Sequence, residues 1–315
     1  MKLSVGIPVF NEQEVLPKLL ARLLPVLDGI EGGPHEVIFV DDGSTDSSRS
    51  VLADASSRDP RIRVVVLSRN FGHQAALGAA LDYATGNAVV LMDADLQDQP
   101  EMIPAFVARH RAGADVVFAR RRSREEGWLL RLAYRAFYRL ISALSDTHLP
   151  LDTGDFALLG QPVVAALRRL PEHERYLRGL RAWVGFTQVG LDVDRQARAA
   201  GKPKYTTWKL MKLAVDGVCS FSIVPLRAAA ATGLVAIAGS VAFSVYSVWL
   251  RLAVGHVPQG FTASIVIMTF LSGVQLLFLG VIGEYLGRVY GEAKGRPPYV
   301  VARVLGDGCC RPTND

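Results

Sequence analysis

The stretch Val37-Ile-Phe-Val-Asp-Asp-Gly-Ser-Thr-Asp46 decides the fold class of this 315-residue chain. Four apolar residues in succession predict a strand that is covered on both faces, and the polar turn that follows leads into a helical pattern. The same order of short apolar strand, polar turn and helix recurs on both sides of this stretch. The sequence therefore predicts an α/β domain with a mostly parallel sheet.

The expected strands and helices alternate through the first part of the chain. Strands are expected at Leu3–Val9, Glu36–Val40, Arg63–Leu67, Ala88–Met92 and Asp115–Ala119, and helices near Glu14–Leu27, Asp46–Ser57, Gln74–Tyr83 and Ile103–Arg111. Ligands of such sheets bind at the carboxyl ends of the strands, so a site is expected in the turns that follow them.

Carboxylates gather in these turns. Asp93 and Asp95 follow the fourth strand one residue apart, and two carboxylates this close repel each other unless a cation or an unusual proton balances them. Oxygen ligands of this kind suit Mg²⁺ or Mn²⁺, and Gln97 adds a neutral oxygen, so the pattern indicates a metal–diphosphate site. Asp46, by contrast, is expected to cap a helix. His73 is either a ligand contact or a plain loop residue.

Composition excludes several classes of protein. Half of the residues are hydrophobic and 21% are charged, which is not the profile of a disordered chain. Lys and Arg exceed Asp and Glu by only 35 to 30, so no nucleic-acid partner is expected. Three cysteines cannot build a disulfide scaffold. The absence of G-x-G-x-x-G and G-x-x-x-x-G-K-[S/T] disfavours dinucleotide dehydrogenases and P-loop enzymes.

Two stretches near the C-terminus, Ala228–Leu250 and Phe261–Gly283, contain no charged residue. Each is long enough as a helix to cross a hydrocarbon core of about 30 Å, so we expect two transmembrane helices at about 228–250 and 261–283. Basic residues are more frequent outside this pair than in the link between its members. The positive-inside rule therefore places the α/β domain and both termini in the cytoplasm, in a multi-pass protein of the cell (inner) membrane.

Two further segments have features of helices at a membrane surface. Trp128–Leu144 carries Arg131, Arg135 and Arg139 at helical spacing among apolar residues, which fits either an interfacial helix or a helix packed on the sheet. Tyr205–Phe221 leads directly into the first expected span and favours the interfacial alternative. Small residues in the two spans suit packing either between copies, as in a homo-oligomer, or within one hairpin.

The ordered set of motifs resembles the family 2 glycosyltransferases, which have the nucleotide-sugar GT-A fold. The motifs are P-V-F-N-E at 8–12, V-D-D-G-S-T-D at 40–46, D-A-D-L-Q-D at 93–98, T-G-D-F at 153–156 and G-K-P-K-Y at 201–205. With a terminal hairpin, the set looks like the polyprenyl-phosphate glycosyltransferases, which include dolichol-phosphate mannose synthase and the bacterial enzymes that glucosylate undecaprenyl phosphate. The resemblance covers roughly Lys2–Leu226, and the two spans extend it.

The resemblance implies a role for each residue that matches a motif. Binding of the base and ribose is implied for Pro8, Phe10, Glu12 and Asp41 or Asp42. The metal and the diphosphate would be held by Asp93, Asp95 and Gln97, with Asp95 also counted as catalytic. Asp155 would face the reacting sugar as an orienting group or weak base, Arg121 and Arg135 would bind the acceptor phosphate, and Lys202 and Lys204 would belong to a loop that closes over the donor.

The implied reaction is inverting, metal-dependent transfer of one sugar from a nucleotide sugar, with UDP-glucose as the first choice, to undecaprenyl phosphate at the cytoplasmic membrane face. The product would be a lipid-linked sugar for glycan modification. GDP-mannose as the donor is an alternative, and so is a non-catalytic membrane subunit that binds a nucleotide sugar. The Q-x-x-R-W motif of processive synthases is missing, since the nearest match is Arg178-Gly-Leu-Arg-Ala-Trp183.

The expected organisation follows from these assignments. A cytoplasmic GT-A domain would occupy residues 1–203, and an interfacial segment residues 204–226. The two transmembrane helices would lie within 227–287, followed by a cytoplasmic tail at 288–315. The expected partners are the nucleotide sugar, the polyprenyl phosphate and the membrane itself.

Overall fold

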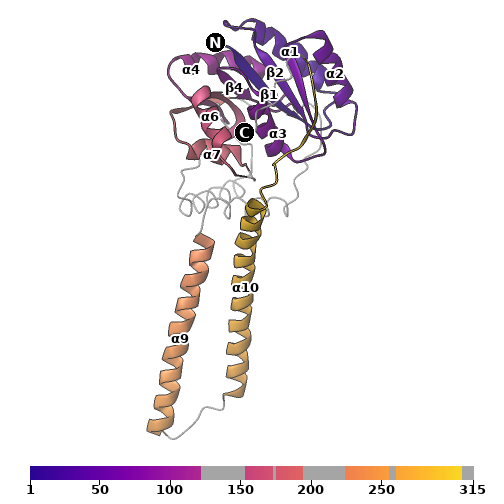
Figure 1. The fold of residues 1–315 in the computed structure, drawn as a ribbon. Coiled ribbons are helices and arrows are strands. Elements are labelled where there is room, and N and C mark those ends of the chain that lie inside the picture. Colours follow the sequence, from indigo (N-terminus) through magenta and orange to yellow (C-terminus); the bar gives the residue numbers. More distant parts are fainter. Residues whose placement is uncertain (122–152, 173–174, 194–223, 255–259, 307–315) are drawn as a thin grey trace. The chain divides into compact units, whose positions relative to one another are not determined.

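The computed structural model describes residues 1–121, 153–172, 175–193, 224–254 and 260–306 (Figure 1). A sheet with its flanking helices makes one compact unit, and two long helices belong to a second unit. The first unit carries all the described residues of the expected site.

The first unit contains a sheet of strand order β7-β5-β6-β4-β1-β2-β3-β8. The strands are β1 (Leu3–Val9), β2 (Glu36–Asp41), β3 (Ile62–Leu67), β4 (Ala88–Leu91), β5 (Val116–Arg121), β6 (Thr153–Gly160), β7 (Gln188–Val193) and β8 (Val301–Leu305). The neighbours from β4 to β3 are parallel, as are β5 and β7, whereas β6 and β8 run antiparallel to their neighbours. The predicted α/β fold with a mostly parallel sheet is confirmed, and β1 to β5 are the five predicted strands.

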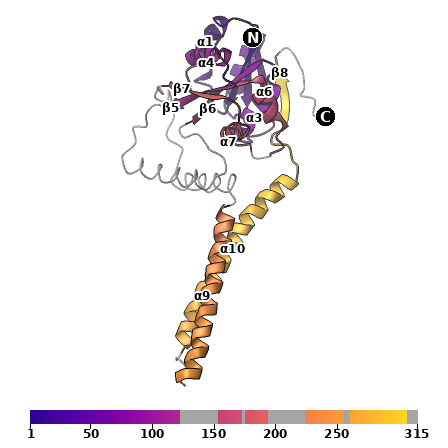
Figure 2. The ribbon, with the colours of Figure 1, turned by 90° about the vertical axis from the view of Figure 1, so that its left-hand side faces the viewer.

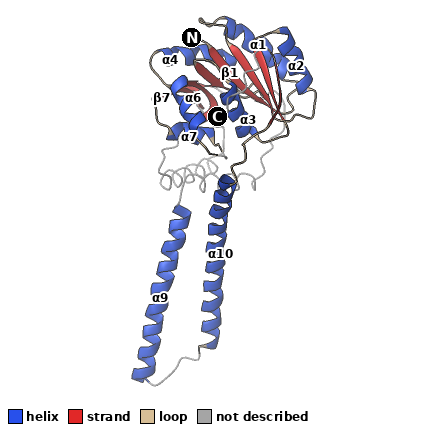
Figure 3. Ribbon diagram, viewed as in Figure 1, coloured by secondary structure: helices blue, strands red, loops and turns tan. Residues whose placement is uncertain are grey.

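Helices cover both faces of the sheet, as Figure 3 shows. One face carries α1 (Leu16–Asp28), α2 (Ser48–Arg58), the short 3-10 helix η1 (Pro100–Met102) and α4 (Ile103–Arg111), and the other carries α3 (His73–Tyr83), α6 (Gln161–Arg169) and α7 (Leu177–Trp183). Successive side chains of a strand point to opposite faces. Phe39 therefore joins the first core, and its neighbours Ile38 and Val40 join the second. This double burial explains the continuous apolar runs of the sequence.

Strand β8, like β6 and β7, was not among the strands predicted from the sequence. It pairs antiparallel with β3, with Val65 opposite Val304, at one edge of the sheet (Figure 2). Just before it, the Tyr299 hydroxyl donates to Asp82 Oδ2 at 2.7 Å. The segment 288–315, predicted as a tail, thus contains a strand, whose backbone groups gain their partners from β3.

The second unit contains α9 (Val224–Val254) and α10 (Phe261–Ala293). By length and composition, one stretch of the described residues could cross a membrane, namely Phe270–Ala293 in α10. This stretch begins later than the span predicted at 261–283. The span predicted at 228–250 lies within α9 and stays a prediction. The interfacial segments predicted at 128–144 and 205–221 lie outside the described residues.

Candidate active site

Asp93 and Asp155 meet at one end of the sheet although they are far apart in the sequence. The antiparallel register of β4 and β6 places Leu91 opposite Ala157. Two residues beyond this pair, Asp93 follows the end of β4 and Asp155 lies inside β6. Both carboxylates therefore lie at the carboxyl end of β4, where the parallel strands predict a ligand site.

Two basic side chains complete this cluster. The Nε2 atom of His73, at the start of α3, lies 3.4 Å from Asp93 Oδ1 and 3.5 Å from Asp155 Oδ2. Arg178, on α7, holds Asp155 in a bidentate ion pair, with Nε donating to Oδ1 at 2.7 Å and Nη2 donating to Oδ2 at 2.6 Å. The Asp155 side chain is only 4% exposed, so this pair is a strong one.

The pKa values of the cluster follow from these contacts. Burial would raise the pKa of Asp155, but the hydrogen bonds from Arg178 and His73 outweigh burial and hold that pKa well below its usual range. Burial acts to lower the pKa of His73, yet the contacts with Asp155 and Asp93 raise it overall. The pKa of Asp93 is raised, chiefly by burial and against the charge of His73. Asp155 is therefore ionised at neutral pH, which suits an orienting group better than a strong base.

The turn after β4 offers an open position for a cation. Asp93 Oδ1 is buried and accepts no hydrogen bond from the described residues, although His73 Nε2 lies 3.4 Å away. Asp95 Oδ1 accepts the backbone N–H of Gln97 at 3.0 Å. Asp93, Gln97 and Asp98 line one cavity together with Asp155. A buried carboxylate oxygen without a hydrogen bond is unusual and fits a hard divalent cation. The described residues contain no group of three or more His, Cys, Asp or Glu that could hold a metal ion.

The carboxylates of Asp42 and Asp41 accept hydrogen bonds from nearby residues of the chain. The carboxylate of Asp42 accepts the backbone N–H groups of Phe71 at 2.7 Å and Gly72 at 3.0 Å. Gly43 follows with φ +72°, and a Cβ there would come within 2.6 Å of the Arg69 and Asn70 backbone. The turns after β2 and β3 therefore lie in direct contact, which requires glycine at this position.

The Asp41 carboxylate has two partners of its own. It accepts the Ser44 backbone N–H at 3.0 Å and Arg49 Nε at 2.9 Å, and the residue is fully buried. Both acidic residues that the resemblance assigns to the base and ribose thus already hold the turns in place. Their predicted ligand contacts stay predictions.

Asn11 ties the turn after β1 to the turn after β2. Its Oδ1 accepts the backbone N–H of Thr45 at 2.8 Å, and its own backbone has φ 57°, in the left-handed region that asparagine tolerates. Next to it, the Glu12 N–H donates to Ser48 Oγ at 2.8 Å. Asp46 Oδ1 accepts the Ser48 N–H at 2.9 Å, but Ser47 occupies the N-cap position of α2, so the prediction that Asp46 caps this helix is wrong.

Of the residues predicted to bind the base, Phe10 has the most accessible side chain that the structure shows. It is 41% exposed directly after β1, whereas Pro8 is buried within the strand. An exposed aromatic ring at the end of a strand suits stacking on a planar base.

Some predicted site residues are not among the residues that the structure describes. Arg135, Lys202 and Lys204 lie outside the described residues, and so does the side chain of Arg121, whose backbone ends β5 opposite Val193. The sequence motifs assigned no role to Arg178. A sequence signal was present, since Arg178 and Arg181 are three residues apart and such residues share one face of a helix.

The chain is similar in sequence to several known proteins. The family model described as glycosyl transferase family 2 matches residues 4–168. An uncharacterized glycosyltransferase of Synechocystis is 43% identical, with 97% of this chain and 96% of that protein covered. The prophage bactoprenol glucosyl transferase homolog of Escherichia coli is 38% identical over 96% of this chain and 99% of its own length. A prophage-derived bactoprenol glucosyl transferase of Shigella flexneri is 37% identical, with coverages of 96% and 98%.

Proposed function

The chain belongs to glycosyl transferase family 2, and from this premise we propose that it transfers one glucosyl residue from UDP-glucose to undecaprenyl phosphate. The relatives from Escherichia coli and Shigella flexneri support the substrate classes, because their names contain bactoprenol glucosyl transferase and they match nearly the whole chain. The observation that carries the chemistry is that Asp93 and Asp155 meet at the carboxyl end of β4, where a buried oxygen of Asp93 accepts no hydrogen bond from the described residues.

The proposed reaction is a single displacement. An oxygen of the lipid phosphate forms a bond to the anomeric carbon, and the bond from that carbon to the nucleoside diphosphate breaks, so the configuration inverts. The second pKa of a phosphate monoester is about 6, so the acceptor is already ionised and needs no strong base. Asp155, kept ionised by Arg178, orients the sugar or acts as a weak base. His73 places positive charge between Asp93 and Asp155 and reduces their repulsion.

The donor would lie along the turns after β1, β2 and β4. Asp93, Asp95 and Gln97 would hold Mg²⁺ or Mn²⁺ with the diphosphate, and the ion when bound neutralises the charge of the leaving group. The exposed ring of Phe10 supports a place for the base, with Pro8 and Glu12 beside it. Arg121 and Arg135 for the acceptor phosphate, and Lys202 and Lys204 for a donor loop, complete the proposal.

The sheet supports two membrane crossings. Strand β8 follows α10, and it pairs with β3, which precedes α9. The chain therefore enters and leaves the α9–α10 segment on the same side of any membrane, and such a chain crosses the membrane an even number of times. We accordingly retain two transmembrane helices near 228–250 and 261–283, with the sheet and both termini in the cytoplasm.

The function is tested with membranes that contain the chain, undecaprenyl phosphate and a panel of labelled nucleotide sugars. We expect label from UDP-glucose to enter the lipid fraction, and a chelator to abolish the transfer until Mg²⁺ or Mn²⁺ is added back. Asp95→Asn should abolish transfer while the chain remains in the membrane.

Each other outcome corrects one part of the proposal. Label from GDP-mannose alone would change the donor. Unchanged turnover of Asp95→Asn would remove the metal assignment. Label from no donor would favour a non-catalytic subunit that binds a nucleotide sugar.

A further inference from the structure

Arg181 lies three residues after Arg178 on α7 and is the more deeply buried of the two. The residue is 3% exposed, and its guanidinium lies 4.9 Å from the centre of the Phe118 ring. Its Nε and Nη2 atoms are buried and donate no hydrogen bond to any of the described residues. Asp155 favours the charge of Arg181 electrostatically, but both of its oxygens are hydrogen-bonded to Arg178. Burying guanidinium nitrogens without hydrogen bonds is costly, so Arg181 is a candidate for contact with a ligand.

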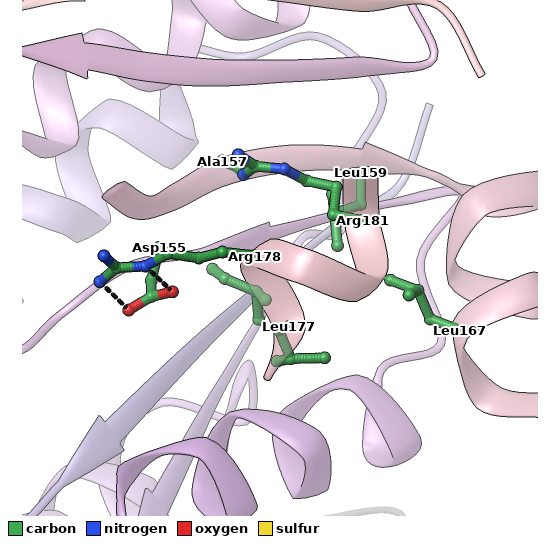
Figure 4. Close-up of a pocket in the computed structure, with 8 residues that line it drawn as sticks. Asp155, Ala157, Leu159, Leu167, Leu177, Arg178 and Arg181 are labelled. Atoms are coloured by element: carbon green, nitrogen blue, oxygen red, sulfur yellow. Dashed lines mark hydrogen bonds and ion pairs between the residues drawn. The ribbon is translucent and has the colours of Figure 1, made fainter. Parts of the chain in front are cut away.

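Asp155 borders two cavities of different character. On one side it shares a cavity with Asp93, Gln97 and Asp98. On the other it shares a cavity with Arg178 and Arg181, whose other walls are four leucines and one alanine (Figure 4). Figure 4 shows both arginine side chains leaving α7 on the side of Asp155. One cavity is therefore acidic, and the other is basic with apolar walls, which strengthen the electrostatic interactions inside it.

This contrast matches the two anions of an inverting displacement. The leaving diphosphate and the attacking phosphate must lie on opposite faces of the anomeric carbon. The acidic cavity suits a diphosphate that arrives with a divalent cation, and the basic cavity suits an anion that arrives without one. A phosphate monoester carries a charge of about −1.5 to −2 at neutral pH. Such a group would add negative charge beside the two arginines, of which only Arg178 has a bidentate carboxylate partner.

We propose that Arg181 binds the phosphate group of the lipid acceptor at the mouth of the basic cavity. The inference rests on the proposed function for the identity of that acceptor. The cavity has room for little more than a water molecule, so the phosphate lies at its mouth, beside Asp155 and Arg178. Arg178 fixes Asp155, while the buried guanidinium of Arg181 attracts the phosphate through its positive charge, which the apolar walls of the cavity screen only weakly. Burial lowers the pKa of Arg181 to about 10, so the side chain is still cationic at neutral pH.

The test compares Arg181→Gln and Arg181→Lys in the full-length chain. Arg169→Gln, which alters an exposed arginine on α6, is the matched control. The KM for a short-chain polyprenyl phosphate and the KM for the nucleotide sugar are measured separately. We expect Arg181→Gln to raise the acceptor KM by about tenfold or more, because the positive charge facing the phosphate is lost, and to change the donor KM less than about twofold. Arg181→Lys should have an acceptor KM between those of Arg181→Gln and the wild type. Arg169→Gln should have the KM values of the wild type.

Thermal unfolding distinguishes this role from simple packing. Replacing a buried guanidinium whose nitrogens lack hydrogen bonds removes a desolvation cost, so Arg181→Gln without lipid should unfold close to the wild-type temperature. A lower Tm with an equal rise of both KM values would identify a packing residue and overturn the proposal. An unchanged acceptor KM, or a rise of the donor KM alone, would overturn it as well.

A binding measurement keeps this test separate from the proposed function. Affinity for a polyprenyl phosphate is compared with affinity for the polyprenol of the same length, without any sugar donor. The wild type should prefer the phosphate, and Arg181→Gln should lose about tenfold of that preference. Equal preference in both would refute the role of Arg181. Failure of the wild type to transfer glucose would instead refute the proposed function.

Discussion

Two regions lie at the ends of strands of the same sheet: the turns after β1 and β2, and the cluster around Asp155. They differ in whether their polar side-chain atoms have hydrogen-bond partners. In the turns, the side chains of Asn11, Asp41 and Asp42 accept hydrogen bonds from the chain itself. Around Asp155, Asp93 Oδ1 and two nitrogens of Arg181 are buried without a hydrogen-bond partner. Among the described residues, the turns therefore have their hydrogen bonds in place, whereas the cluster around Asp155 keeps three buried polar atoms that a ligand could satisfy.

Arg178→Gln should have the largest effect on the Asp155 side of this comparison. The change removes the bidentate partner of a carboxylate that is 4% exposed, and we expect transfer to fall by about a hundredfold because the sugar is no longer oriented. The pKa of Asp155 should rise toward its usual range once Arg178 is gone. Asp155 then becomes protonated at higher pH than in the wild type. The acid limb of the pH–rate profile should therefore move to higher pH.

Two further experiments test whether the ion pair between Arg178 and Asp155 causes this effect. Arg178→Lys keeps the charge without the fork and should recover only part of the activity. In a double-mutant cycle, Asp155→Asn with Arg178→Gln should cost much less than the sum of the two single changes. Additive losses would mean that the ion pair is not the reason for the effect.

Asp42→Asn should have an intermediate effect, on stability rather than on chemistry. An asparagine amide has one acceptor oxygen, so the N–H of Phe71 or of Gly72 would face a second donor. We expect the free energy of unfolding to fall by about 1–3 kcal/mol, measured as a lower Tm of the full chain in detergent. Asp54→Asn, at an exposed position of α2, is the control. A raised donor KM at unchanged Tm would show a direct ligand contact instead.

His73→Gln should have the smallest effect, and it depends on pH. Since the pKa of His73 is raised in the folded chain, its stabilising contribution is fully present below the unfolded pKa of about 6.5 and is lost as the pH rises through the folded value. Its side chain is 44% exposed, so the contribution should be about 0.5 kcal/mol or less. The Tm difference between the wild type and His73→Gln should shrink above pH about 6.5. A difference that grows with pH would contradict the ion pair.

The sequence predicted what depends on local pattern. Strands β1 to β5 and the helices between them follow from apolar runs, polar turns and helical spacing, because each segment carries its own signal. The turn after β4 was identified for the same reason, since Asp93 and Asp95 are neighbours in the chain. Asp155 was named only through its motif, since no local pattern predicts the β4–β6 register that brings it to Asp93.

What the sequence could not predict depends on partners far along the chain. The short stretch Val301–Leu305 becomes a strand only because β3 pairs with it. Arg178 forms its ion pair with Asp155, and Asp42 accepts hydrogen bonds from backbone groups of the next turn. In each case the residue type was visible, but its partner was fixed by tertiary contacts.

The pairing of β8 with β3 also orders events during synthesis. The ribosome makes β3 early and β8 near the end of the chain, after both long helices. Until then the outer edge of β3 exposes unpaired backbone groups, which invite wrong association between nascent chains. A chain that stopped after α10 would keep all the described residues of the site and still lack the strand that closes its sheet.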